Sequence, residues 1–326
     1  MEVILEKVGA IFPAFGAEYF GNERELLDLY SESIEEYLKK ANTVYKIDMD
    51  DFQTRIKGDF SDELQSQIIC YAYSCAIGNI LKKNDFQADF ISFYSMGIYA
   101  ALHYAGSLDY IDGIRIIKFC YDLVRENSST DSFCMGIVVG LMENEIYKII
   151  EKYSFQNIEI INRNSKHNMV LSGKEREVTG FLESCLQEGA LYAKTINIKT
   201  PFHTKFVGDV QNEILSFINT ELTIKDPIYP IISGYDQRIV NSIAEIKKEI
   251  VFNVRHSLNW EKTFESMLDV GIKCFVECGP GNSLNRIVKF IPGNFEIYNI
   301  RNLGNLLKTS GFMLNSLLKN TKKRSC

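Results

Sequence analysis

The sequence predicts an α/β fold that is interrupted by a small α+β insertion. Helical patterns, with apolar residues every three or four positions, alternate with short apolar strands towards both ends of the chain. Between them the pattern changes to the order β-α-β-β-α-β, which is the ferredoxin-like arrangement. We therefore expect a large α/β subdomain made of residues 1–130 and 198–326, and a small ferredoxin-like α+β subdomain made of residues 131–197.

The elements before the insertion are assigned from the spacing of apolar residues and from helix-capping signals. Ser61 is a good N-cap, since the acids that follow it, Asp62 and Glu63, are favoured in the first turn of a helix. In chain order we expect a strand at 9–12, a helix at 22–41, a helix from 61 to 81, a strand at 88–94, and helices at 98–105 and 109–125.

The insertion and the segments after it are assigned in the same way. Runs rich in β-branched and aromatic residues, bounded by turn residues, indicate strands. In chain order we expect a strand at 134–141, a helix at 143–153, strands at 158–162 and 168–171, a helix at 174–187, a strand at 191–198, and further strands at 228–233 and 273–276.

Composition limits the kinds of function that the chain can have. The formal net charge of −6 argues against a nucleic-acid binder, which needs a clustered positive surface. Met1-Glu2-Val3 carries an acid where a secretory signal carries basic residues, so we expect a cytosolic protein. The eight cysteines lack the spacing of a metal site, and we expect buried thiols and no bound metal.

A candidate nucleophile lies at the end of an apolar strand. Ser95 follows the strand-like segment 88–94 and precedes Gly97 and a helical pattern. In such a strand–turn–helix arrangement the turn exposes the serine hydroxyl, and the helix N-terminus offers a backbone N–H and a positive dipole end to an oxyanion. The sequence therefore predicts a nucleophile elbow at Ser95.

Only four histidines are available as the base for such a serine. His103 lies within the helix after the elbow, where we expect it to pack, and His167 lies in a polar turn, where we expect it to be exposed. His203 stands between a strand and a helix, directly after Pro201 and Phe202, which suits an imidazole held at the edge of a cleft. His203 is therefore a candidate base, and its local sequence is equally compatible with a structural role.

Four segments, in order and at matching spacing, resemble the malonyl-CoA:acyl-carrier-protein transacylase family. The family has Phe-Pro-Gly-Gln-Gly, His-Ser-Leu-Gly-Glu-Tyr-Ala-Ala, Pro-Phe-His-Ser and Glu-Val-Gly-Pro-Gly. The matching segments here are Phe12-Pro-Ala-Phe-Gly16, Tyr94-Ser-Met-Gly-Ile-Tyr-Ala-Ala101, Pro201-Phe-His-Thr204 and Glu277-Cys-Gly-Pro-Gly281. Segments 161–165 and 169–173 also resemble the family's ferredoxin-like insertion, and the resemblance spans residues 8 to 292.

The resemblance implies an α/β-hydrolase-like large subdomain and an enzyme that moves acyl groups in two steps. Ser95, deprotonated by His203, would take the acyl group from a thioester, and a second acceptor would remove it. The backbone N–H groups of Phe15 and Met96 match the family's oxyanion donors, and the backbone carbonyl of His256 matches the group that orients its histidine. Acyl carrier protein and acyl-CoA are the implied partners, without nucleic acid, membrane or any cofactor beyond the phosphopantetheine that carries the acyl group.

The acyl pocket departs from the family pattern. Malonyl-transferring members carry an arginine at a fixed distance after the nucleophile, where its guanidinium pairs with the malonyl carboxylate, but here the count reaches Cys120. The neighbouring Arg115 and Arg125 should face elsewhere on the same helix. We expect Cys120, Phe202 and Tyr94 to line a more apolar pocket, which suits an uncharged acyl group such as acetyl.

These departures favour one branch of the family. The pattern of exchanges resembles that of the discrete acyl hydrolases found with polyketide synthases that lack built-in acyltransferase domains. Those hydrolases use water to remove stalled acyl groups from carrier proteins. The alternative is a malonyl-CoA or other acyl-CoA:acyl-carrier-protein transacylase that supplies a polyketide or fatty-acid synthase. A third hypothesis is a homologue that only binds a carrier protein, and the presence of both Ser95 and His203 argues against it.

Overall fold

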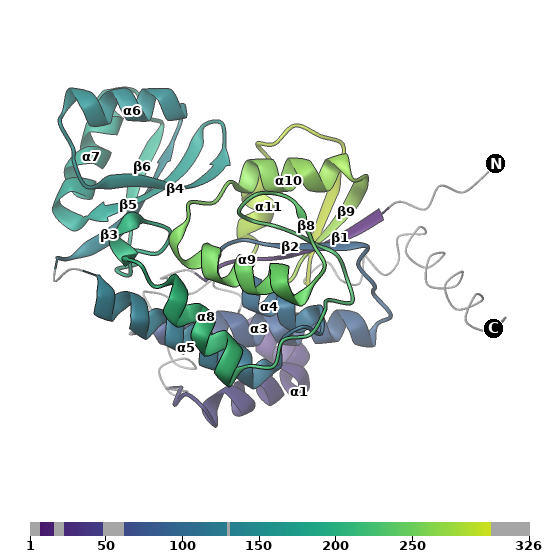
Figure 1. The fold of residues 1–326 in the computed structure, drawn as a ribbon. Helices are drawn as coiled ribbons and strands as arrows, with labels where there is room; N and C mark the ends of the chain where they lie inside the picture. The colour runs from purple at the N-terminus through teal and green to yellow at the C-terminus, as the bar shows by residue number, and fades with distance from the viewer. Residues whose placement is uncertain (1–6, 16–22, 48–61, 129–130, 301–326) are drawn as a thin grey trace.

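The computed structural model describes residues 7–15, 23–47, 62–128 and 131–300 (Figure 1). Two sheets divide these residues into a large and a small subdomain, which lie side by side. Gly16 of the first motif and the expected cap Ser61 lie outside the described residues. Asp62, the residue after Ser61, is the N-cap of its helix, because its side chain accepts a hydrogen bond from the Gln65 backbone N–H.

The large subdomain is built on a six-stranded sheet with the order β10-β9-β1-β2-β7-β8. All neighbouring strands are parallel except β7 and β8, which are antiparallel. β1 lies at the centre and is buried over nearly its whole length, which explains its continuous apolar sequence. The strands are β1 (Lys7–Phe12), β2 (Phe90–Phe93), β7 (Ile231–Ile232), β8 (Ile239–Val240), β9 (Ile272–Glu277) and β10 (Glu296–Asn299).

Helices cover both faces of this sheet. Ala10 and Phe12 of β1 pack into the core under the larger helical layer, whereas Ile11, between them, packs on the opposite face against α10 and α11. The larger layer contains α1 (Glu23–Asn42), α3 (Glu63–Lys83), α4 (Gly97–Tyr104), α5 (Tyr110–Asn127), α8 (Gln211–Glu221) and α9 (Ile243–Arg255). The opposite layer contains α10 (Trp260–Asp269) and α11 (Ser283–Val288).

The small subdomain is an antiparallel four-stranded sheet with the order β4-β5-β3-β6. With the helices α6 and α7 it follows the β-α-β-β-α-β order that the sequence predicts, and it has its own apolar core. Its elements are β3 (Phe133–Val139), α6 (Glu143–Lys152), β4 (Ile158–Ser165), β5 (Asn168–Lys174), α7 (Glu175–Gln187) and β6 (Tyr192–Ile196), and the predicted limits of 131–197 enclose them.

The edge strand β4 joins the small subdomain to the large one. The Leu258 backbone N–H donates to the Ile161 carbonyl at 2.8 Å, and the Arg163 N–H donates to the Leu258 carbonyl at 3.2 Å. The side-chain oxygen of Asn162 accepts from the Trp260 backbone N–H at 3.2 Å. The segment that follows α9 is therefore fixed to the small subdomain.

The predicted α/β fold with a ferredoxin-like insertion is confirmed, and the differences concern short strands. The expected strand at 228–233 shortens to Ile231–Ile232, because Pro227 and Pro230 offer no N–H to a ladder. The sequence also missed the short strands β8 and β10. Among the helices of the described ranges, none has the length and apolar character that crossing a bilayer requires.

Candidate active site

The turn between β2 and α4 presents Ser95. The φ angle of Ser95 is 52°, in the left-handed region that residues other than glycine seldom adopt. The Gly97 N–H donates to the Tyr94 carbonyl at 3.0 Å, and the Ile98 N–H donates to the Ser95 carbonyl at 3.1 Å. A sharp strand-to-helix turn with a serine at its tip is the geometry of a nucleophile elbow.

Two glycines bring separate motifs into contact at this elbow. A Cβ atom at Gly97 would lie 2.2 Å from the carbonyl oxygen of Phe12, which leaves room only for glycine. A Cβ atom at Gly279 would lie 2.2 Å from Cγ of Pro13. The segment that follows β1 is therefore packed directly between the elbow and the loop after β9.

His203 lies next to the serine. Its Nε2 is 2.7 Å from Ser95 Oγ, although 108 positions separate the two residues in the sequence. His203 has a φ angle of 65°, and its backbone N–H donates to the Val254 carbonyl at 2.9 Å. Within the same turn the Thr204 hydroxyl donates to the Pro201 carbonyl at 2.6 Å, so the loop that carries the imidazole is braced on both sides.

The surroundings of His203 select its charge state and its tautomer. The Nδ1 atom lies 3.2 Å from the backbone carbonyl of His256, and a carbonyl can only accept, so Nδ1 carries the proton. Nε2 is then free to accept from the Ser95 hydroxyl. Burial lowers the pKa of His203 to about 4, and the neighbouring carbonyls of His256 and Asn253 oppose this only in part. The imidazole is therefore neutral at pH 7, as a general base must be.

Aromatic packing fixes the backbone of His256, which caps α9. The rings of Tyr235 and Phe252 lie 4.9 Å and 5.0 Å from the His256 ring, measured between centroids. The Nε2 atom of Gln211 is 3.4 Å from Nε2 of His256. The imidazole of His256 thus serves as packing, and its carbonyl is the group that meets His203.

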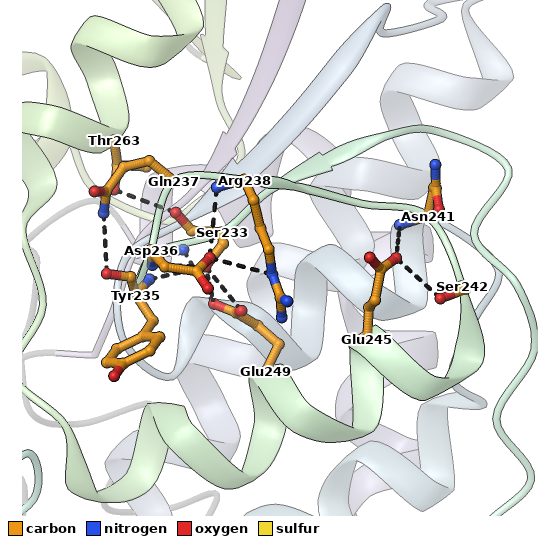
Figure 2. Close-up of polar contacts among 11 residues, drawn as sticks. Ser233, Tyr235, Asp236, Gln237, Arg238, Asn241, Ser242, Glu245, Glu249 and Thr263 are labelled. Carbon is orange, nitrogen blue, oxygen red and sulfur yellow. Dashed lines mark hydrogen bonds and ion pairs between the residues drawn. The ribbon is translucent and has the colours of Figure 1, made fainter.

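A buried carboxylate shapes the loop that carries Tyr235 (Figure 2). Glu249 of α9 is only 2% exposed, and both of its oxygens lie within 2.9 Å of the Ser233 hydroxyl. It also accepts from the Gly234 N–H, and the Ser233 oxygen in turn accepts from the Tyr235 N–H. Burial raises the pKa of Glu249 to about 6. This network holds Tyr235 against His256 without touching the dyad itself.

A small cavity opens beside the dyad between α3, α5 and the His203 loop, with a volume of about 20 Å³. Ser95 and His203 form one wall, and the rest is mainly apolar. Its lining residues are Phe15, Gln67, Ser95, Met96, Tyr99, Ile117, Cys120, Phe202, His203, Asn253 and Val254. Cys120 and Phe202 both line this cavity, their role in binding an acyl group stays a prediction, and no lysine or arginine is among the described lining residues.

The two arginines near Cys120 are engaged elsewhere. Arg115 pairs with Asp112 and Glu221, at 3.0 Å and 2.7 Å, on the side of α5 that faces α8. The Nη1 atom of Arg125 donates to the Tyr121 hydroxyl at 3.2 Å, and Arg125 lines a separate polar cavity. Neither guanidinium takes the place of the arginine that pairs with the malonyl carboxylate in malonyl-transferring members of the family.

Phe15 and Met96, the predicted oxyanion donors, both line the cavity beside Ser95. Within the described part of the chain, neither backbone N–H donates a hydrogen bond to a protein acceptor. Two free N–H groups next to a nucleophile are what an oxyanion hole requires. Their role stays a prediction, which the position of both groups supports.

The structure corrects the expectation that Tyr94 lines the acyl pocket. Its hydroxyl donates to Oδ1 of Asn164 at 2.8 Å, and its ring lies 5.6 Å from the Trp260 ring in the core on the other face of the sheet. His103 packs, with Nδ1 3.1 Å from the Leu108 carbonyl, and His167 is exposed, as expected. In the described ranges, no three His, Cys, Asp or Glu side chains are placed to hold a metal ion.

Five residues of the cavity wall were not predicted from the sequence: the amides Gln67 and Asn253, and Tyr99, Ile117 and Val254. Gln67 lies in the almost fully buried helix α3, and Asn253 lies in the last turn of α9. Nδ2 of Asn253 donates to the Ser95 carbonyl at 3.2 Å. The one available signal was a polar amide inside an otherwise buried helical run, which does not reveal the direction in which the amide points.

Curated relatives support the resemblance found in the motifs. No family model matches the sequence. A malonyl CoA-acyl carrier protein transacylase of Bacillus subtilis is 22% identical over 298 residues, which covers 87% of this chain and 90% of the relative. A protein of the same name from Staphylococcus aureus is 24% identical over 304 residues and covers 92% of this chain and 97% of the relative.

Solved structures agree in fold over nearly the same length. A malonyl CoA-acyl carrier protein transacylase from Coxiella burnetii superposes with a TM-score of 0.81, at 24% identity, over 97% of this chain and 98% of the other. A type II polyketide synthase acyl-carrier protein in complex with its malonyl-transacylase gives a TM-score of 0.79, at 20% identity, over 94% and 98% of the two chains. The resemblance is thereby confirmed: the chain is similar in sequence to malonyl CoA-acyl carrier protein transacylases over 87% or more of its length, and it shares the fold of the solved structures.

Proposed function

We propose that the protein is an acyltransferase that moves a short uncharged acyl group from a thioester to an acyl carrier protein through an acyl-Ser95 intermediate. The observation that carries this proposal is the oriented dyad, in which Ser95 Oγ lies 2.7 Å from a buried His203 whose Nδ1 faces the His256 carbonyl. A serine hydroxyl becomes an effective nucleophile only beside such a positioned base.

The first half of the reaction acylates the serine. Oγ of Ser95 attacks the thioester carbonyl carbon while its proton passes to Nε2 of His203. The oxyanion that forms accepts hydrogen bonds from the backbone N–H groups of Phe15 and Met96. The carbon–sulfur bond then breaks, and the proton on His203 goes to the leaving thiolate.

The second half returns the enzyme to its starting state. The thiol of a carrier-protein phosphopantetheine gives its proton to His203 and attacks the carbonyl of acyl-Ser95. The bond between that carbonyl carbon and Oγ breaks, and Ser95 recovers its proton from the imidazole. The named activity of the relatives favours this thiol acceptor over water, as does the neighbour solved with a carrier protein.

The lining of the cavity argues for an uncharged acyl group. Cys120 is 2% exposed, and burial raises the pKa of its thiol to about 12, so it is neutral at pH 7. A malonyl carboxylate would find no cation among the described lining residues and would lose the charge-assisted pairing that offsets its desolvation.

Hydrolysis of acyl carrier proteins is the second candidate function. The observation that favours it is again Cys120, since loss of the malonyl clamp suits an enzyme that removes acetyl groups and does not deliver malonyl groups. The two candidates share the acyl-Ser95 intermediate and differ only in the acceptor that removes the acyl group.

The test follows the acyl group by intact-protein mass spectrometry. The protein is mixed with acetyl-CoA or malonyl-CoA, and holo acyl carrier protein is then added, with Ser95→Ala as the control. We expect a transient acetyl mass on the wild type, its transfer to the carrier protein, and poor malonylation. Release of free acetate without carrier-protein labelling would favour hydrolysis, and acylation of Ser95→Ala would refute the serine mechanism.

A further inference from the structure

The acyl cavity contains two polar atoms that the proposed reaction does not use. Gln67 and Asn253 both line it, with exposed fractions of 3% and 4%. In the described part of the chain, Nε2 of Gln67 and Oδ1 of Asn253 have no hydrogen-bond partner. One is a donor and the other an acceptor, and both belong to the wall of the same small space.

The orientation of Asn253 is fixed by its other end. Its Nδ2 donates to the Ser95 carbonyl at 3.2 Å, so the amide oxygen is the atom left without a partner. A buried polar atom without a hydrogen bond costs roughly 1–3 kcal/mol, and folded proteins leave few of them unpaired. A pair of such atoms beside a nucleophile therefore indicates a polar group that arrives with the substrate.

The size and charge of the cavity limit which chemical group of a substrate can occupy it. A volume of about 20 Å³ holds little more than one water, which needs about 10–15 Å³ by the same measure. A carboxylate would place its oxygens against the acceptor Oδ1 of Asn253. A methyl group fits the space but leaves both amides unpaired. A hydroxyl matches both atoms in chemistry, because it can accept a hydrogen bond, as the Gln67 donor requires, and donate one, as the Asn253 acceptor requires.

We propose that this cavity selects short acyl groups that carry a hydroxyl on the α or β carbon, with Gln67 and Asn253 as the specificity-determining pair. The inference rests on the proposed acyl-Ser95 function and adds the class of acyl group. A site built to hydrogen-bond a hydroxyl discriminates strongly against the analogue that lacks it, because its own polar groups are then left unpaired.

The experiment compares initial rates of Ser95 acylation for hydroxyacetyl-CoA, 3-hydroxypropionyl-CoA and acetyl-CoA. Gln67→Met removes the donor at nearly constant volume, and the matched control Gln65→Met changes a buried glutamine of the same helix that does not line the cavity. Asn253 is left intact, because its Nδ2 supports the elbow. Acetyl-CoA serves as the internal reference in each variant.

We expect one hydroxyacyl thioester to acylate the wild type about tenfold faster than acetyl-CoA or more, and this preference to vanish in Gln67→Met but not in Gln65→Met. Equal rates for all three thioesters, unchanged by Gln67→Met, would overturn the inference and assign the two amides to a resident water. That outcome still leaves an acylated serine. Failure of the proposed function looks different, since no thioester would then add mass to Ser95.

Discussion

Lowering the pH from 8 to 5 should leave the acylation of Ser95 almost unchanged. Burial lowers the pKa of His203 to about 4, and only the neutral imidazole can accept the serine proton. At pH 5 a base with that pKa is about 90% neutral, whereas a histidine at the ordinary value of about 6.5 is about 3% neutral. The structure therefore predicts a rate at pH 5 roughly thirtyfold above that of a solvent-exposed dyad.

The measurement is a single-turnover acylation by acetyl-CoA, quenched in acid and read by intact mass, at intervals from pH 4 to pH 8. Circular dichroism at each pH shows that the protein stays folded, and Ser95→Ala gives the background. A rate that falls with a midpoint between pH 6 and 7 would show that His203 is hydrated, and the reasoning from its burial would be wrong.

The stability of the folded protein sets the lowest pH at which this assay can be run. A histidine whose pKa is lowered on folding contributes stability above the unfolded pKa and loses it as the pH falls through the folded one. For His203 the loss amounts to about 3 kcal/mol between pH 6.5 and pH 4. Glu277 and Glu249 have the opposite effect on stability. Burial raises their pKa values to about 7 and about 6, so the folded state gains stability as these carboxyl groups take up protons at lower pH.

Three further substitutions test separate parts of the structure. Ser95→Ala should gain no acyl mass from any thioester, and mass on a cysteine instead would contradict the elbow. Cys120→Arg should raise malonyl over acetyl loading, by up to about 10- to 150-fold where the guanidinium fits beside Phe202. An unchanged ratio in a folded, active variant would show that residue 120 does not meet the acyl group. Glu249 should cost the folded state about 1 kcal/mol of stability as the pH rises from 5 to 8, and Glu249→Gln should remove that loss. Thermal melts measure it, and an unaltered pH dependence would mean that this carboxyl does not titrate there.

The local sequence indicated the elbow, and the family resemblance distinguished it from the many surface turns that share the Ser-x-Gly pattern. A strand, a serine, a glycine and a helix follow one another within a few residues, and the structure places Ser95 at the tip of that turn. His203 could not be chosen from its own surroundings, since Pro201 and Phe202 only indicate a rigid loop. The resemblance to a family supplied the pairing, and the fold then brings Nε2 within 2.7 Å of Oγ.

The parts of the site that the sequence did not predict depend on the direction in which side chains point. Tyr94 adjoins Ser95 in sequence, yet consecutive side chains at a strand end point to opposite faces, so its ring packs with Trp260 and not in the cavity. Gln67 and Asn253 come from helices that meet only in the folded chain. No local pattern reports that meeting, because each helix is buried on several sides.

The backbone of the two reacting residues has a consequence for how such a protein can change. Ser95 and His203 both have positive φ angles, 52° and 65°, which suit glycine better than any other residue. Ser95→Gly should therefore be more stable than Ser95→Ala by roughly 1 kcal/mol in free energy of unfolding, and should melt at a higher temperature, because glycine adopts a positive φ angle without strain. Selection for thermal tolerance alone would favour that inactive form. Serine at this position is retained for catalysis although glycine would suit the backbone better. In a homologue that no longer catalyses the reaction, we expect Ser95 to be replaced early.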